Sequence, residues 1–195
     1  MKACPIQTLT WNPPGTWLCW PPTDVRAARS EAASLVSGTY LLALTAAVDA
    51  FQEIIEREIP GTAAAALWVP DETTREPLAT AVLRVTSADP GGRWSLKETL
   101  DFAHSSASPM RGAKLLNAEV APARTVAGDA VLRTVDSVRR VTRRVSREWT
   151  LYILPPGTDE TLLLQAQSSH VAFFDEITES LADIARTVAV TLESP

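Results

Sequence analysis

Two histidines are the first residues to consider, because imidazole is a common general base and metal ligand near neutral pH. His104 lies three residues after Asp101, near the end of an expected helix, and His170 directly follows Ser169. Zinc needs three or four converging ligands, and the sequence has no such spacing. Adjacent residues rarely face each other as nucleophile and base, and no Gly-x-Ser-x-Gly motif is present. We therefore assign no catalytic residue and no metal ligand, and we expect a protein that is not an enzyme.

Motifs for cofactor binding are equally weak. The doublet Gly91-Gly92 lacks the longer glycine-rich pattern that cradles phosphate. Carboxylates cluster on the solvated sides of two expected amphipathic helices, which is the usual place for runs of charge. We therefore predict no cofactor. The clustered carboxylates are Glu53, Glu56, Glu58, Asp175, Glu176 and Glu179.

One basic run stands out in an acidic chain: residues 139–147 read RRVTRRVSR. Its arginines could bind an acidic partner protein, a phosphorylated ligand or a membrane surface. Alternatively, the run is a strand and a turn whose arginines point to water or pair with carboxylates, which also discourages edge-to-edge aggregation. The valine spacing would suit a basic helix too, but the β-branched content favours a strand. The candidate partner-binding residues of this run are Arg139, Arg140, Arg143 and Arg144.

The second candidate surface is a Pro- and Trp-rich arm, residues 1–22, which precedes an expected single α+β domain at residues 23–195. Tryptophan is enriched at binding hot spots, so Trp17 and Trp20 are candidate partner-binding residues. In the alternative interpretation, the arm packs back onto the domain as a lid over the sheet. If the arm does not pack on the domain, its tryptophans form an exposed aromatic patch, and a patch of that size would need a partner.

Composition limits the class of protein. The hydrophobic fraction of 46% and the charged fraction of 21% are those of a globular chain. A net charge of −5 argues against nucleic acid as the main partner, because phosphate binding requires excess Lys and Arg. Cys4 and Cys19 are too few for a secreted disulfide scaffold. We favour two reduced thiols, with a bridge between them as the alternative.

The location of the protein is inferred from apolar runs. The first ten residues contain no apolar run of the length that a signal peptide needs. The most apolar window, residues 40–48, is too short to span a bilayer, which takes about 20 residues. We therefore expect a cytoplasmic protein without a membrane span.

The helices and strands that must position these residues are predicted from the period of the apolar residues and from the Gly and Pro residues that interrupt them. Helical patterns cover residues 24–58, divided at Gly38, and residues 173–187. Ser95 and Glu98 form a capping-box pair that starts a short helix ending near residue 104. Hairpins followed by helices indicate α+β class, with a largely antiparallel sheet flanked by helices. Strands are expected at residues 17–20, 63–69, 79–86, 114–120, 123–126, 130–135, 145–154, 161–167 and 188–192, with Pro122 and Gly128 as breaks.

From residue 125 to residue 192, the order of motifs resembles the C-terminal half of the PsbP/Mog-like superfamily, especially its LpqN-type bacterial members. The resemblance implies an α-β-α sandwich around an antiparallel sheet. It also implies an accessory or protein-binding module without chemistry of its own. The LpqN-type lipoproteins carry a lipobox that this sequence lacks, and no family site residue can be transferred. The motifs are TVAGDAVLR (125–133), WTLYILPPG (149–157), TLLLQAQ (161–167) and FDEI (174–177).

We therefore expect an uncharacterised accessory or protein-interaction module whose partner is another protein. The alternative is a small-ligand binding protein with an apolar pocket between sheet and helices, lined by Trp68, Trp94 or Trp149. An enzyme of unrecognised type is the third class. A deep pocket holding a histidine beside a carboxylate with a shifted pKa would indicate it.

Overall fold

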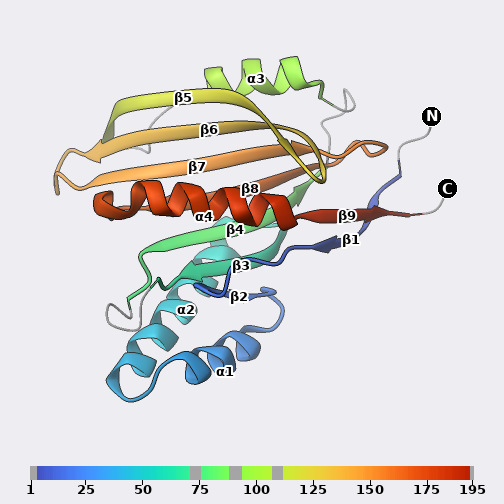
Figure 1. Cartoon of the computed structure of the whole chain (residues 1–195). Helices are drawn as coiled ribbons and strands as arrows, with labels where there is room; N and C mark the ends of the chain where they lie inside the picture. The colour runs from blue at the N-terminus through green and yellow to red at the C-terminus, as the bar shows by residue number, and fades with distance from the viewer. Residues whose placement is uncertain (1–3, 71–75, 88–93, 107–111, 194–195) are drawn as a thin grey trace.

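The computed structural model describes residues 4–70, 76–87, 94–106 and 112–193. Within these residues, the main sheet has seven strands in the order β2-β3-β4-β8-β7-β6-β5, and all the paired neighbours are antiparallel. The predicted α+β class, with an antiparallel sheet flanked by helices, is confirmed (Figure 1). The strands are β2 (Trp17–Trp20), β3 (Thr62–Trp68), β4 (Ala79–Thr86), β5 (Ala113–Thr125), β6 (Gly128–Arg139), β7 (Val145–Leu154) and β8 (Thr161–Ser168).

Helices cover both faces of this sheet. The helices α1 (Val25–Leu35) and α2 (Thr39–Glu58) pack over β2, β3 and β4. The helix α3 (Leu96–Ser105) covers β5 and β6 on the same face. The opposite face carries α4 (Phe174–Thr187), preceded by the short turn η1 (Val171–Phe173). Figure 1 shows α3 and the α1–α2 pair at opposite ends of the sheet, with α4 lying along the strands in front.

Strand alternation explains why the two faces of the sheet carry separate hydrophobic clusters. Successive side chains of a strand point to opposite faces. In β7, Trp149, Leu151 and Ile153 enter the core beneath α4, whereas Tyr152 packs with the α3 side. The helical spacing of α4 likewise buries one apolar stripe, formed by Phe174, Ile177, Leu181, Ile184 and Val188.

Local signals set the helix boundaries correctly. The Asp24 side chain accepts a hydrogen bond from the backbone N–H of Ala27 and caps α1. Gly38, with φ of 64°, divides α1 from α2 as predicted. Ser95 and Glu98 form the predicted capping box, and the hydrogen bonds from Ser95 hold the pKa of Glu98 below its usual value.

Two strand predictions need correction. Pro122 does not break a strand, because β5 runs from Ala113 to Thr125 as one element at the edge of the sheet. Proline lacks an N–H donor, and an edge strand tolerates that loss. The next strand is longer than predicted, because β6 runs from Gly128 to Arg139 and not from residue 130 to residue 135. The doublet Gly91-Gly92 lies outside the described residues.

The two ends of the described chain meet in a ribbon. The strand β1 (Ile6–Thr10) pairs antiparallel with β9 (Ala189–Leu192). The sequence analysis predicts β9 but not β1, because it includes the residues of β1 in the arm. The N–H of Ile6 also donates to the Glu160 carboxylate at 2.6 Å, which ties the ribbon to the turn before β8.

Candidate functional site

The candidate site begins at the turn between β6 and β7, residues 139–144, which we name the arginine tip. All six residues are exposed, and Val141 is 93% exposed. The N–H of Arg143 donates to the Arg139 carbonyl at 2.9 Å, and the N–H of Arg139 donates to the Arg144 carbonyl at 3.0 Å. The N–H of Arg140 donates to the Gly112 carbonyl at 3.1 Å, beside the start of β5. The tip therefore has a defined backbone shape, and the basic-helix interpretation is wrong.

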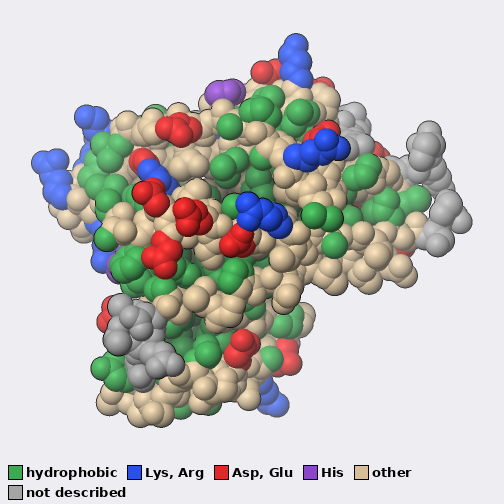
Figure 2. Space-filling view, in the orientation of Figure 1, with side chains coloured by type: hydrophobic (Ala, Val, Ile, Leu, Met, Phe, Trp, Pro, Cys, Tyr) green, Lys and Arg blue, Asp and Glu red, His purple; other side chains and the backbone are tan. Residues whose placement is uncertain are grey.

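The four arginines of the tip carry charge that the chain does not neutralise. Within the described residues, none of their guanidinium groups forms an ion pair or a side-chain hydrogen bond. Lys114, also exposed, lies opposite Val138 next to the tip. Figure 2 shows Lys and Arg side chains gathered at this left end of the molecule. The predicted arginine candidates are thus brought together on one surface.

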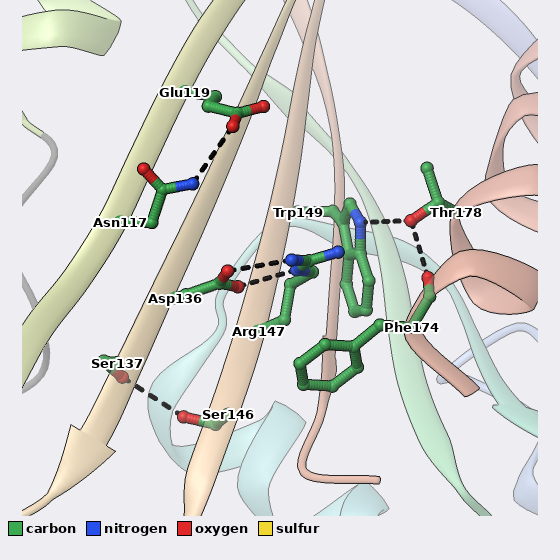
Figure 3. A network of polar contacts seen from close by, with 9 residues as sticks. All are labelled: Asn117, Glu119, Asp136, Ser137, Ser146, Arg147, Trp149, Phe174 and Thr178. Carbon is green, nitrogen blue, oxygen red and sulfur yellow. Dashed lines mark hydrogen bonds and ion pairs between the residues drawn. The ribbon is translucent and has the colours of Figure 1, made fainter. Parts of the chain in front are cut away.

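A polar network anchors the stem of this hairpin to α4 (Figure 3). Asp136 and Arg147 lie opposite each other in β6 and β7. The Arg147 guanidinium donates to both Asp136 carboxylate oxygens, at 2.6 and 2.8 Å, and this bonding raises the pKa of Arg147. The same guanidinium lies 4.7 Å from the ring centre of Phe174, the first residue of α4. Charge and ring quadrupole therefore hold the hairpin against the helix.

Other members of the network lie around this pair. The Trp149 indole N–H donates to the Thr178 hydroxyl at 3.0 Å, and that hydroxyl donates to the Phe174 carbonyl at 2.7 Å. Ser137 and Ser146 share a hydrogen bond of 3.2 Å nearer the tip. The sequence analysis includes Arg147 in the basic run but does not identify Asp136 as its partner, because only the strand register makes them neighbours.

The prediction that the tryptophans of the arm bind a partner needs correction. Trp17 and Trp20 are 3% and 2% exposed, so neither presents an indole to a partner. The Trp17 indole N–H donates to Ser180 of α4 at 2.7 Å, and that of Trp20 donates to Gln52 of α2 at 3.0 Å. Burial of large apolar rings is strongly favourable. Residues 17–20 therefore pack back on the domain, as in the alternative interpretation, but as the edge strand β2 of the sheet and not as a lid over it.

A cavity of about 210 Å³ lies between α4 and the sheet. Trp149 lines it, as the alternative function predicted. An apolar cavity of roughly 150 Å³ is enough to hold benzene, so this one is large enough for a small apolar molecule. Its other apolar lining residues include Leu132, Leu151, Leu164, Leu181 and Ala185, and the side chains of Arg124 and Arg186 also contribute.

Trp94 and Trp68 have different surroundings. Trp94 lines a second cavity of about 190 Å³ with Phe102 and Tyr152, on the α3 side of the sheet. Trp68 is buried in the core beneath α4, where its ring contacts Phe173 and Trp17.

The residues with catalytic potential do not converge. His104 is exposed at the end of α3, and His170 is partly buried before η1. Among the described residues, no group of three or more His, Cys, Asp or Glu is placed to hold a metal ion. No disulfide joins Cys4 and Cys19. Burial, with Glu31 adding to it, raises the pKa of the Cys19 thiol to about 12, so Cys19 is a poor nucleophile at neutral pH.

Comparisons with known proteins bear on the fold. No known protein family matches the chain, and no curated protein matches it in sequence. Among solved structures, it is similar to the crystal structure of LpqN involved in cell envelope biogenesis of Mycobacterium tuberculosis. The TM-score is 0.52 and the identity 13%, over 94% of this chain and 83% of that one. No helix in the described segments is long and apolar enough to cross a membrane. The likeness to LpqN therefore extends from the C-terminal third to nearly the whole chain, as a distant similarity of fold.

Proposed function

We propose that this chain is a non-enzymatic interaction module whose arginine tip binds an acidic segment of another protein. The observation that carries the proposal is four exposed guanidinium groups on one turn, without ion-pair partners in the described structure. Arginines elsewhere in the chain, such as Arg29 and Arg147, do pair with carboxylates. Guanidinium binds carboxylate in a bidentate geometry, which suits an acidic peptide.

The architecture supports this proposal in two ways. The Asp136–Arg147 pair and the α4 contact fix the stem, so little entropy is lost when the tip engages a partner. LpqN, which shares the fold, is described as involved in cell envelope biogenesis. A module that docks on other proteins would serve an accessory role of that kind, whereas the net charge of −5 disfavours nucleic acid.

The test is a binding titration with a fluorescein-labelled peptide of ten alternating Glu and Gly residues, followed by anisotropy. The tip variant changes Arg139, Arg140, Arg143 and Arg144 to Glu. We expect it to bind at least about tenfold more weakly than wild type, since charge-assisted hydrogen bonds are lost. Its thermal unfolding should be unchanged, because exposed side chains without partners contribute little to stability.

A matched control separates a local site from overall charge. It changes four exposed bases elsewhere to Glu, namely Arg26, Arg57, Lys97 and Arg124. Both variants alter the net charge equally, so the control should stay within about threefold of wild type. Equal losses in the two variants, or equally tight binding of single-stranded DNA, would contradict the proposal.

The cavity between α4 and the sheet favours a second candidate function, binding of a small apolar molecule. Ala182 lines the cavity from the exposed side of α4, so Ala182→Leu would fill it without disturbing the buried stripe. Indole titrated by NMR should shift the methyl signals of Leu132 and Leu164 in wild type and not in this variant. Identical shifts in both proteins would eliminate the cavity as the site.

A further inference from the structure

The sheet face opposite α4 has a polar row in the stretch between α2 and α3. Arg133 of β6 lies opposite Thr150 of β7, and Thr150 lies opposite Gln165 of β8. Arg84 of β4 pairs with Leu163, one position further along the same face. Helices normally cover such a face with apolar contacts. Four polar side chains across four strands therefore require an explanation.

Each of the two arginines in this row donates a hydrogen bond to a polar side chain on the neighbouring strand. The Arg84 Nη1 group donates to Gln165 Oε1 at 3.2 Å, and the Arg133 Nη2 group donates to Thr150 Oγ1 at 3.1 Å. Directly opposed side chains in a sheet have Cβ atoms roughly 5 Å apart. The two guanidinium groups thus bind the two members of one opposed pair, Gln165 and Thr150. Arg133 is further held by the carbonyl and hydroxyl oxygens of Ser106, both at 3.0 Å.

Both guanidinium groups retain unused donors. The Nε atoms of Arg84 and Arg133 are buried and have no hydrogen-bond partner among the described residues. A buried donor without a partner is rare in folded proteins and points to a ligand or an ordered water. In the described structure, Arg84 makes its one side-chain hydrogen bond through Nη1. Its Nε–Nη2 edge, which can bind a carboxylate in bidentate fashion, is thus unoccupied.

A groove of about 330 Å³ adjoins this row. Thr150 and Gln165 belong both to the row and to the groove floor, together with Thr80, Glu148 and Gln167. The wall is apolar and comes from α2, through Phe51, Ile54 and Ile59. The groove therefore has a polar floor and an apolar wall, and the two arginines adjoin it through the floor residues Gln165 and Thr150, to which they donate.

The net charge of the site is +1 when Glu148 is ionised. Arg84 and Arg133 contribute two cations, and Glu148 lies one position along β7 on the same face. Burial raises the pKa of Glu148, while the charge of Arg133 lowers it. A ligand with one negative charge would complete the balance, whereas a dianion such as phosphate would exceed it.

We propose that this groove binds a small organic monocarboxylate. Its carboxylate lies on Arg84 and Arg133, and its apolar part packs against Phe51 and Ile54. A rotation of the partly exposed Arg84 side chain opens the Nε–Nη2 edge to the ligand. The groove and the arginine tip share no residue, so this site is independent of the proposed protein-binding function.

The test uses 3-phenylpropanoate as the probe, titrated by NMR against the folded full chain. Binding should shift the side-chain amide signals of Gln165 and Gln167, which line the groove. The methyl signals of Leu164 and Leu181, which line the cavity under α4 and not the groove, should stay in place. Shifts at the α4 side, or no saturable shift up to millimolar probe, would overturn the proposal.

Variants and analogues identify the contacts. Arg84→Gln should weaken binding at least about tenfold, because it removes a bidentate charged contact. Arg133→Gln should do the same, with its fold checked by thermal unfolding since it also holds Ser106. Arg124→Gln, on exposed surface elsewhere, should bind as wild type does. Equal binding of wild type and Arg84→Gln, or equal binding of the neutral 3-phenylpropanamide, would refute the assignment.

Two further ligands define the occupant. Inorganic phosphate should compete only weakly, because its second charge is not balanced. A short peptide ending in Phe with a free C-terminus carries the same carboxylate from a protein source. If it binds more than tenfold tighter than 3-phenylpropanoate, while its amidated form does not bind, the occupant is a protein C-terminus and the small-molecule proposal is wrong.

Discussion

Gly128 sets the geometry of the turn that joins β5 to β6. Its φ of 146° lies in a region that side chains other than glycine rarely adopt. A Cβ atom at this position would also collide with the Leu154 carbonyl oxygen on β7. We predict that Gly128→Ala lowers the free energy of unfolding by at least about 2 kcal/mol, as measured by urea denaturation. Gly15→Ala is the control, because nothing lies within 4 Å of a Cβ there, and it should change stability by under about 1 kcal/mol.

Glu148 gives the stability a defined pH dependence. Burial holds its pKa above the ordinary value of 4.5 in the folded state. A carboxyl group with a raised folded pKa favours the folded state below its unfolded pKa, and that contribution is lost as pH rises through the folded pKa. We predict that Glu148→Gln stabilises the protein at pH 7 by roughly 0.5 kcal/mol, allowing for solvent screening, and not at pH 3.5.

Urea denaturation at the two pH values checks this prediction. Glu179→Gln, on the exposed side of α4, provides the matched control and should show no such difference. A gain of equal size for Glu148→Gln at both pH values would mean that the effect arises from packing and not from ionisation.

At the scale of elements, the β6–β7 hairpin depends on the Asp136–Arg147 pair. The two side chains are only 13% and 23% exposed, so each charge is largely removed from water. Removing one partner leaves the other desolvated and unpaired. We predict that Arg147→Met costs about 2–4 kcal/mol of unfolding free energy. The double variant Arg147→Met with Asp136→Leu should recover at least half of that loss.

Thermal and urea unfolding of the single and double variants provide the measurement. Arg124→Met is the comparison, since its pair with Asp129 spans 4.0 Å with both side chains well exposed, and it should cost under about 0.5 kcal/mol. A double variant no more stable than Arg147→Met would show that the pair holds the hairpin through something other than charge balance.

The edges of the sheet are protected in different ways. At one edge, β2 is only four residues long. At the other, β5 is long but carries Pro122 and an irregularity between Leu115 and Asn117. Proline and bulges both hinder pairing with a further strand. Pro122, predicted as a strand break, therefore hinders the pairing of β5 with a strand of another molecule.

At the scale of the whole molecule, exposed and enclosed charges should respond differently to salt. Raising NaCl from 0.1 to 1 M shortens the Debye length from about 10 to about 3 Å. We predict that acidic peptide binding at the exposed arginine tip weakens about tenfold or more over this range. Binding of 3-phenylpropanoate in the groove should weaken less than about threefold, because buried charges are less screened. Anisotropy and NMR titrations in the two buffers measure these changes.

The sequence by itself determined most of the elements. The stripe of α4, the alternation of β7 and the capping box of α3 all follow from spacings of a few residues. Such local patterns fix which face of an element is buried, because they arise from the 3.6- and 2-residue periods of helix and strand. They also grouped the four tip arginines, which lie within six positions of one another in the chain.

Only the tertiary structure decided which faces meet. Trp17 and Trp20 looked alike in the sequence, yet they enter opposite cores because an odd number of positions separates them in β2. The row of Arg84, Arg133, Thr150 and Gln165 is assembled by long-range pairing, with Arg84 and Gln165 81 positions apart. Strand order and register depend on the packing of the whole sheet, and no short-range spacing encodes them. For that reason, the sequence alone could indicate the exposed tip but not the polar groove.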